Sequence, residues 1–211
     1  MLDIKEKLVH YVALGDSLAE GVTPYGEMDK GYPSYLSDML RNTESTFQFH
    51  NFGVHGYTSE DLKRELLENQ TIRNTLKEAT IITLNIGAND FFRSLRSDPN
   101  SAEDTLKQFT QNFSIILDNM THINKTANVY VLGYYNPFEK APEEMKSKLT
   151  ELLTIVNGII KNKTGANKFT FVEIDSVVSA NYDECLPNPE DFHLSAKGYE
   201  LLANRIFEML K

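Results

Sequence analysis

Short apolar runs alternate with longer amphipathic segments along the whole chain. Runs rich in β-branched and aromatic residues predict strands, and they cover residues 10–15, 46–53, 79–87, 128–134 and 168–175. Apolar residues spaced three and four apart predict helices at residues 32–42, 59–69, 101–125, 142–163 and 195–210. The clearest helical stripe consists of Leu106, Phe109, Phe113, Ile116, Leu117 and Met120.

This alternation predicts a single α/β domain over residues 1–211, with a parallel sheet between two layers of helices. The runs 81–86 and 129–132 are apolar with little alternation, which is typical of central strands covered on both faces. No repeat or Pro/Gly-rich linker indicates a second domain. First-turn acids or a proline indicate helix starts at three positions: Ser59, Ser101 and Pro142.

Composition narrows the class of protein. Hydrophobic residues make up 41% of the 211 residues and charged residues 24%, which is typical of a globular protein with a core of its own. The formal net charge of −9 argues against nucleic acid or an anionic membrane as a partner. Cys185 is the only cysteine, so an internal disulfide and a cysteine-based zinc site are both excluded.

The N-terminal segment "MLDIKEKLVHYVALG" carries acids and lacks the basic-then-apolar pattern of a signal peptide. No apolar run approaches the ~20 residues that a membrane-spanning helix needs. We therefore expect a cytoplasmic protein without an integral membrane segment.

Glycine, asparagine and aspartate gather where the predicted strands end. The first three strands end in "GDS" (15–17), "NFGVHG" (51–56) and "NIGAND" (85–90), and "NPEDFHLS" (188–195) follows the last one. Ligands of doubly wound sheets bind beyond the carboxyl ends of the strands, near the point where the strand order reverses. These loops are therefore expected to form the functional site.

Two common interpretations of such loops do not fit. "GDSLAEG" has neither the lysine nor the spacing of a phosphate-binding GxxxxGK[ST] loop, and the dinucleotide fingerprint GxGxxG is absent after the first strand. No serine of the chain lies in the GxSxG frame of the α/β-hydrolase elbow. Without other information Ser17 is either the N-cap of a helix or a nucleophile.

Four segments together resemble the blocks of the GDSL, or SGNH, hydrolase family. They are "GDSL" (15–18), "NFGVHGYT" (51–58), "GAND" (87–90) and "DFHLSAKGY" (191–199), in the order that the family has them. The resemblance implies a flavodoxin-like sheet with strand order 2-1-3-4-5. It also implies hydrolysis of carboxylic esters or thioesters by a serine. No cofactor or metal is expected, because the sequence has no calcium loop, zinc spacing or cofactor motif.

The resemblance assigns the nucleophile to Ser17 and the base to His193, because a hydroxyl needs a neighbouring imidazole to become nucleophilic. The position of the acid stays open. The family places it three residues before the histidine, where this chain has Glu190, whereas the aspartate that is usual at this position stands one residue later, at Asp191. We slightly favour Asp191. The other four histidines lie in predicted strands or helices or lack a local acid: His10, His50, His55 and His122.

The resemblance also supplies an oxyanion hole, formed by the backbone N–H groups of Ser17 and Gly56 and by the side-chain amide of Asn89. Gly56 is expected to be a glycine because the main chain approaches the substrate closely there. Gly53 is expected to be an ordinary turn residue. Asp16 is expected to fix its own loop, and Asp90 the turn that carries Asn89.

Apolar and aromatic residues that follow the strand ends could line an acyl pocket or belong to the core under the loops. They are Tyr25, Tyr32, Phe91, Phe92, Leu95, Tyr134, Tyr135 and Phe138. An acyl pocket would favour a lipid or another small-molecule ester as the substrate. Two alternatives use the same scaffold, namely an O-acetyl-sugar esterase or acyltransferase, and a catalytically silent binding protein.

Overall fold

Five parallel strands form the central sheet of the protein, in the order β2-β1-β3-β4-β5. The computed structural model describes residues 8–43, 46–98, 101–140 and 142–210. The strands are β1 (Leu8–Gly15), β2 (Thr46–Gly53), β3 (Ile81–Asn85), β4 (Asn128–Leu132) and β5 (Thr170–Val172). The predicted α/β class and strand order are confirmed.

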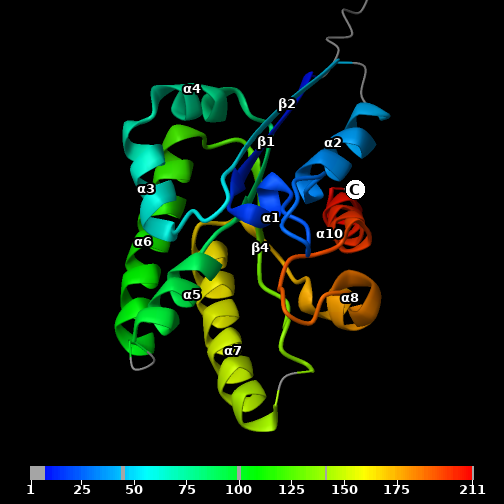
Figure 1. The fold of residues 1–211 in the computed structure, drawn as a ribbon. Coiled ribbons are helices and arrows are strands. Elements are labelled where there is room, and N and C mark those ends of the chain that lie inside the picture. The colour runs from blue at the N-terminus through cyan, green and yellow to red at the C-terminus, as the bar shows by residue number, and fades with distance from the viewer. Residues whose placement is uncertain (1–7, 44–45, 99–100, 141, 211) are drawn as a thin grey trace, which may run out of the picture.

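Helices cover both faces of this sheet (Figure 1). Among the helices within the described ranges, α1, α2, α8, α9 and α10 contribute to the core on one face, and α3 to α7 contribute to the core on the other. Their bounds are α1 (Ser17–Glu20), α2 (Tyr32–Arg41), α3 (Ser59–Glu68), α4 (Gln70–Glu78), α5 (Ala88–Ser97), α6 (Ala102–Ile123), α7 (Glu143–Ala166), α8 (Asp175–Ser179), α9 (Tyr182–Cys185) and α10 (Ala196–Met209).

Strand β1 contributes side chains to both cores, which explains the apolar run at 11–14. Tyr11 and Ala13 point to the face covered by α2 and α10, whereas Val12 and Leu14 point to the face covered by α3 and α6. The buried hydroxyl of Thr83 on β3 lies 2.8 Å from Tyr11 Oη, so this polar group inside the core is hydrogen-bonded.

All predicted strands and helices are present, with ends shifted by a few residues. Five elements were not predicted: α1, α4, α5, α8 and α9. Three of them have only four or five residues, and the glycine- and asparagine-rich segment 85–90 hides the start of α5 in the sequence pattern. Helix α4 begins at the cap Asn69, whose side chain accepts hydrogen bonds from two backbone N–H groups.

The structure corrects the predicted helix starts. Thr58, not Ser59, caps α3, and it forms a reciprocal capping box with Asp61. Ser101 stands at the N-cap position of α6, but its side chain makes no capping hydrogen bond. Pro142 lies just before α7 rather than in its first turn.

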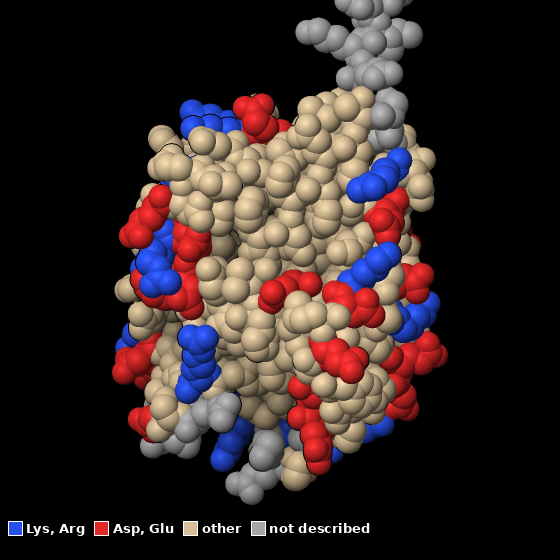
Figure 2. Space-filling view, turned by 45° about the horizontal axis from the view of Figure 1, so that its top comes forward, with Lys and Arg blue, Asp and Glu red and all other residues tan. Residues whose placement is uncertain are grey.

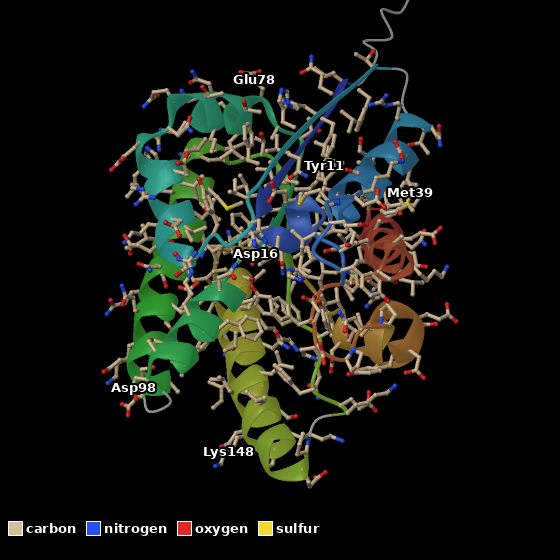
Figure 3. All side chains as sticks on the ribbon, in the orientation of Figure 1. Tyr11, Asp16, Met39, Glu78, Asp98 and Lys148 are labelled. Atoms are coloured by element: carbon tan, nitrogen blue, oxygen red, sulfur yellow. The ribbon has the colours of Figure 1, made fainter. Side chains whose placement is uncertain are left out.

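The sheet register places three strand ends at the same level. Gly15 of β1 is paired with Gly53 of β2 and with Asn85 of β3. The loops that follow these strands therefore leave the sheet side by side, at its carboxyl edge. Asp16 lies in this region, near the middle of the molecule (Figure 3).

The surface carries charges of both signs. On the face shown in Figure 2, Lys and Arg are interspersed with Asp and Glu and do not gather into one patch. Of the helices in the described ranges, none combines the length and the apolar character that crossing a membrane requires.

Candidate active site

Ser17 is held at the carboxyl end of β1 by the start of a one-turn helix. The Asp16 backbone N–H donates to Asn85 O (3.2 Å), and the Asp16 carboxylate caps α1 by accepting from Leu18 N–H (3.1 Å). Ser17 is the first residue of α1 and only 4% exposed. Because the first N–H groups of a helix have no partner inside it, the Ser17 N–H is free to bind a ligand oxygen.

His193 reaches the same edge from the loop that precedes α10. The loop is fixed from two sides: Tyr135 Oη donates to Phe192 O (2.5 Å), and Asn188 Nδ2 donates to Pro24 O (2.7 Å). The His193 side chain is buried. Its position is thus set by contacts that span distant parts of the sequence.

The structure brings Ser17, His193 and Asp191 into one hydrogen-bonded row. His193 Nε2 lies 2.9 Å from Ser17 Oγ, and Nδ1 lies 2.7 Å from Asp191 Oδ1. With the Nδ1 proton directed at the carboxylate, Nε2 remains as the acceptor for the Ser17 hydroxyl. This is the arrangement in which an imidazole can remove a proton from a serine.

The two candidate acids have different environments. Asp191 Oδ1 accepts both the backbone N–H (2.7 Å) and the ring N–H of His193, so a local Asx turn points this carboxylate at the imidazole. Glu190 is exposed, and its backbone N–H donates to Asn188 Oδ1 (3.1 Å). Of the two, the geometry places Asp191 in contact with His193.

Burial lowers the pKa of His193 below its ordinary value of 6.5, and the neighbouring His55 lowers it further. The Asp191 carboxylate acts in the opposite direction through its charge and its hydrogen bond, but the net effect on the pKa of His193 is downward. The imidazole is therefore neutral around pH 7, which is the form that can accept a proton.

The turn after β2 presents Gly56 at the same edge. Gly56 has a left-handed φ of 79°, and the turn is closed by a hydrogen bond from Tyr57 N–H to Val54 O (3.1 Å). A Cβ on Gly56 would meet only Arg93 Nη2, at 3.4 Å. The backbone conformation, not the close approach that the sequence suggested, is therefore the main reason for glycine at this position.

Helix α5 holds this turn through two of its side chains. Asn89 Nδ2 donates to Tyr57 O (2.9 Å), and Arg93 Nη2 donates to Gly56 O (2.6 Å). Among the described residues, no acceptor is paired with the Gly56 N–H or with the second hydrogen of Asn89 Nδ2. Two of the donors that the resemblance assigns to an oxyanion hole, Gly56 N–H and the Asn89 amide, are thus fixed relative to each other.

Two expectations about neighbouring residues were wrong. Asp90 does not hold the turn of Asn89 with its side chain. Its carboxylate accepts from Ser59 N–H (2.8 Å) and from Ser59 Oγ, and so ties α5 to α3. Gly53 is not a simple turn residue, because a Cβ there would lie 2.6 Å from Glu20 N, so β2 ends in close contact with α1.

An apolar cavity opens beside Ser17, between α5 and α7. Its empty volume is about 750 Å³, counting the part that is open to solvent. Its lining is formed by Asp16, Ser17, Leu18, Ala88, Asn89, Phe91, Phe92, Tyr134, Tyr135, Pro137, Phe138, Leu149, Leu152, Leu153, Val156 and Phe192.

The predicted acyl-pocket residues divide into three groups. Five of them line the cavity: Phe91, Phe92, Tyr134, Tyr135 and Phe138. Tyr32 belongs to the core and Tyr25 is 70% exposed, so neither contributes to it. The side chain of Leu95 lies outside the described residues.

Sequence reasoning missed two parts of the site. The segment 142–163 is predicted only as a helix, without a role in the site, whereas Leu149, Leu152 and Leu153 of α7 line the cavity. His55 has no acid near it in the sequence and is not predicted as part of the site, yet its ring centroid lies 6.1 Å from that of His193.

Within the described parts of the chain, no three His, Cys, Asp or Glu side chains form a group that could hold a metal ion.

The three-layer fold and its strand order place the chain in the flavodoxin-like class of α/β proteins. More specifically, it belongs to the GDSL-like lipase/acylhydrolase family, whose sequence model matches residues 11–206.

Individual proteins of several organisms resemble the chain. The Bacillus subtilis (strain 168) protein named "Uncharacterized protein YpmR" is 28% identical to it, over 98% of this chain and 83% of that protein. The lipase Lip_vut3 from a goat rumen metagenome has a TM-score of 0.79 at 23% identity, over 95% and 96% of the two chains. Axe2, an acetylxylan esterase from Geobacillus stearothermophilus, has a TM-score of 0.72 at 16% identity, over 97% and 95%.

Asp16 is a second carboxylate in the site, and it is only 1% exposed. Its Oδ2 has no hydrogen-bond partner among the residues that the structure describes. Burial raises the pKa of Asp16 from 3.8 to about 7, and the nearby charge of Asp90 also raises it, against the effect of the Leu18 N–H. The folded protein therefore keeps a proton that the unfolded chain loses in mild acid.

We expect Asp16→Asn to change how stability depends on pH. Between pH 3.8 and about 7, the Asp16 carboxyl of the wild type is ionised in the unfolded chain but protonated in the folded protein. The wild-type free energy of unfolding therefore falls as the pH rises through this range. The asparagine variant lacks this loss. Urea denaturation at about pH 4.5 and about pH 7.5 should show the variant gaining stability relative to wild type at the higher pH. If variant and wild type differ in free energy of unfolding by the same amount at both pH values, the pKa of Asp16 is not raised in the folded protein.

Proposed function

We propose that the protein is a serine hydrolase that cleaves carboxylic esters through an acyl-enzyme, with Ser17 as the nucleophile. The observation that carries this proposal is the hydrogen-bonded row from Ser17 Oγ through the His193 imidazole to the Asp191 carboxylate. It lies at the mouth of an apolar cavity in a chain of the GDSL-like lipase/acylhydrolase family.

In the first half of the reaction, His193 Nε2 accepts the Ser17 hydroxyl proton while Oγ bonds to the carbonyl carbon of the ester. The carbonyl oxygen becomes an oxyanion and is stabilised by the N–H groups of Ser17 and Gly56 and by the Asn89 amide. The carbon–oxygen bond to the alcohol then breaks, and the alcohol oxygen takes the proton from Nε2. Ser17 is left as an acyl ester.

In the second half, water replaces the alcohol. His193 Nε2 takes a proton from the water as its oxygen attacks the acyl carbon, and the same donors stabilise the second oxyanion. The bond to Oγ breaks, Oγ recovers the proton, and the carboxylic acid leaves. Asp191 stabilises the imidazolium in both halves by accepting its Nδ1–H.

The cavity supports an acyl chain longer than acetyl as the preferred substrate group. Aromatic and aliphatic side chains from α5, α7 and the loop after β4 make up most of its lining, and each buried CH₂ group of a substrate gains about 0.8 kcal/mol there. An acetyl group offers this lining a single methyl group, so the lining favours longer acyl groups over the acetyl esters of an acetylxylan esterase such as the structurally similar Axe2. We therefore prefer lipid or medium-chain acyl esters.

The direct test is Ser17→Ala. We expect the variant to lose hydrolysis of p-nitrophenyl butyrate by a factor of about 10³ or more, because no other group replaces the nucleophile. Ser37→Ala is the matched control, since Ser37 is also a buried serine but lies on α2 away from the cavity. Equal rates for wild type and Ser17→Ala would refute the proposal.

A second test decides between the two acids. Asp191→Asn should lower kcat by about 10²–10⁴-fold, because the amide favours the wrong imidazole tautomer and leaves the imidazolium without its counter-charge. Glu190→Gln should stay within about twofold of wild type, since its side chain is exposed. A larger loss in Glu190→Gln than in Asp191→Asn would assign the acid to Glu190.

The width of the cavity should set the acyl preference. Leu149→Trp adds volume to the lining, so we expect the ratio of kcat/KM for p-nitrophenyl octanoate over p-nitrophenyl acetate to fall at least about fivefold. Ile155→Trp, on the same helix but 43% exposed and outside the lining, is the control. An unchanged ratio in Leu149→Trp would show that the acyl group binds elsewhere.

A further inference from the structure

A second imidazole stands beside His193 at the mouth of the site. His55 lies in the turn after β2, and its ring centroid is 6.1 Å from that of His193, with the two planes at 40°. The residue is exposed. Among the described residues, no hydrogen-bond partner is paired with either ring nitrogen of His55, so both nitrogens can interact with a ligand.

The backbone that carries this ring is fixed on both sides. The His55 N–H donates to the Glu20 carboxylate, and the next carbonyl, Gly56 O, accepts from Arg93 Nη2 at 2.6 Å. The imidazole is thus presented from a rigid turn, while its own nitrogens are not engaged within the protein. Both ring nitrogens are therefore available to a ligand at a defined place beside the catalytic histidine.

The two ring neighbours of His193 belong to different parts of the site. Phe192 lies 4.5 Å from the His193 ring, stacks on Phe92 at 4.3 Å and lines the apolar cavity. His55 is not part of that lining. An acyl chain in the cavity therefore lies on the Phe192 side, and the alcohol half of the ester extends from the catalytic centre toward the solvent-exposed side, where His55 lies.

We propose that His55 binds the alcohol half of the substrate and gives the enzyme a preference for esters of hydroxylated alcohols, such as glycerol or sugars. This inference rests on the proposed function. When the ester bond breaks, His193 Nε2 must deliver its proton to the leaving oxygen, so that oxygen lies next to the His193 ring. A hydroxyl on the neighbouring carbon of the alcohol then comes within reach of the His55 imidazole, which can donate or accept a hydrogen bond.

The experiment compares 1-butyrylglycerol with propyl butyrate, which differ only in the two free hydroxyls of the alcohol. In His55→Phe we expect the ratio of their kcat/KM values to fall about tenfold, because the ring is kept and its nitrogens are lost. His55→Asn should recover part of the ratio, since its amide can bond to a hydroxyl. His122→Phe, an exposed histidine on α6, is the control and should keep the wild-type ratio.

A second readout tests whether the His55 imidazole acts on His193 in the working enzyme. His55 lowers the pKa of His193 and Asp191 raises it. Removing the His55 imidazole should therefore move the acid limb of the kcat/KM profile for propyl butyrate to higher pH, in His55→Phe and in His55→Asn alike.

The outcomes distinguish this inference from the proposed function. If wild type hydrolyses both esters through Ser17 and His55→Phe leaves their ratio unchanged, His55 does not bind the alcohol and the inference is wrong, while the proposed function stands. A wild type that hydrolyses neither ester, with Ser17→Ala no different, would overturn the proposed function and this inference with it.

Discussion

The hydrogen bond between Ser17 Oγ and His193 Nε2 joins two residues that are 176 positions apart, and the candidate site depends on it. It forms because β1 and the loop before α10 meet at the carboxyl edge of one parallel sheet. Tyr199 on α10 adds a second connection, since its hydroxyl donates to Val22 O (2.6 Å), just after α1. The C-terminal helix and the first loop are therefore fixed to each other, and the imidazole cannot move away from the serine independently.

Helix α5 has a comparable role for the remaining groups. Asn89, Asp90 and Arg93 each bond to the segment that follows β2, at Tyr57, Ser59 and Gly56 respectively. Three side chains from one helix thus hold the turn that presents the Gly56 N–H, and one of them, Asn89, is itself a proposed donor. Such rigidity matters for the proposed chemistry, because donors that are already in place need no reorganisation when an oxyanion forms.

Much of the fold and part of the site could be predicted from local patterns. Apolar runs indicated the strands, and the polar strand ends indicated the edge on which Ser17 and His193 lie. Contacts between distant segments could not be read in this way. Nothing local distinguishes Asp191 from Glu190 until the Asx turn is formed, and the proximity of His55 to His193 depends on how two loops pack.

The central claim is that Ser17 is activated by His193, and covalent labelling tests it most directly. The folded protein is treated with a fluorophosphonate probe, and the labelled peptide is identified by mass spectrometry. The account predicts a single adduct on Ser17 in the wild type and none in His193→Ala, because the hydroxyl is then no longer deprotonated. No adduct on Ser17 of the folded wild type, or equal labelling in His193→Ala, would contradict the account.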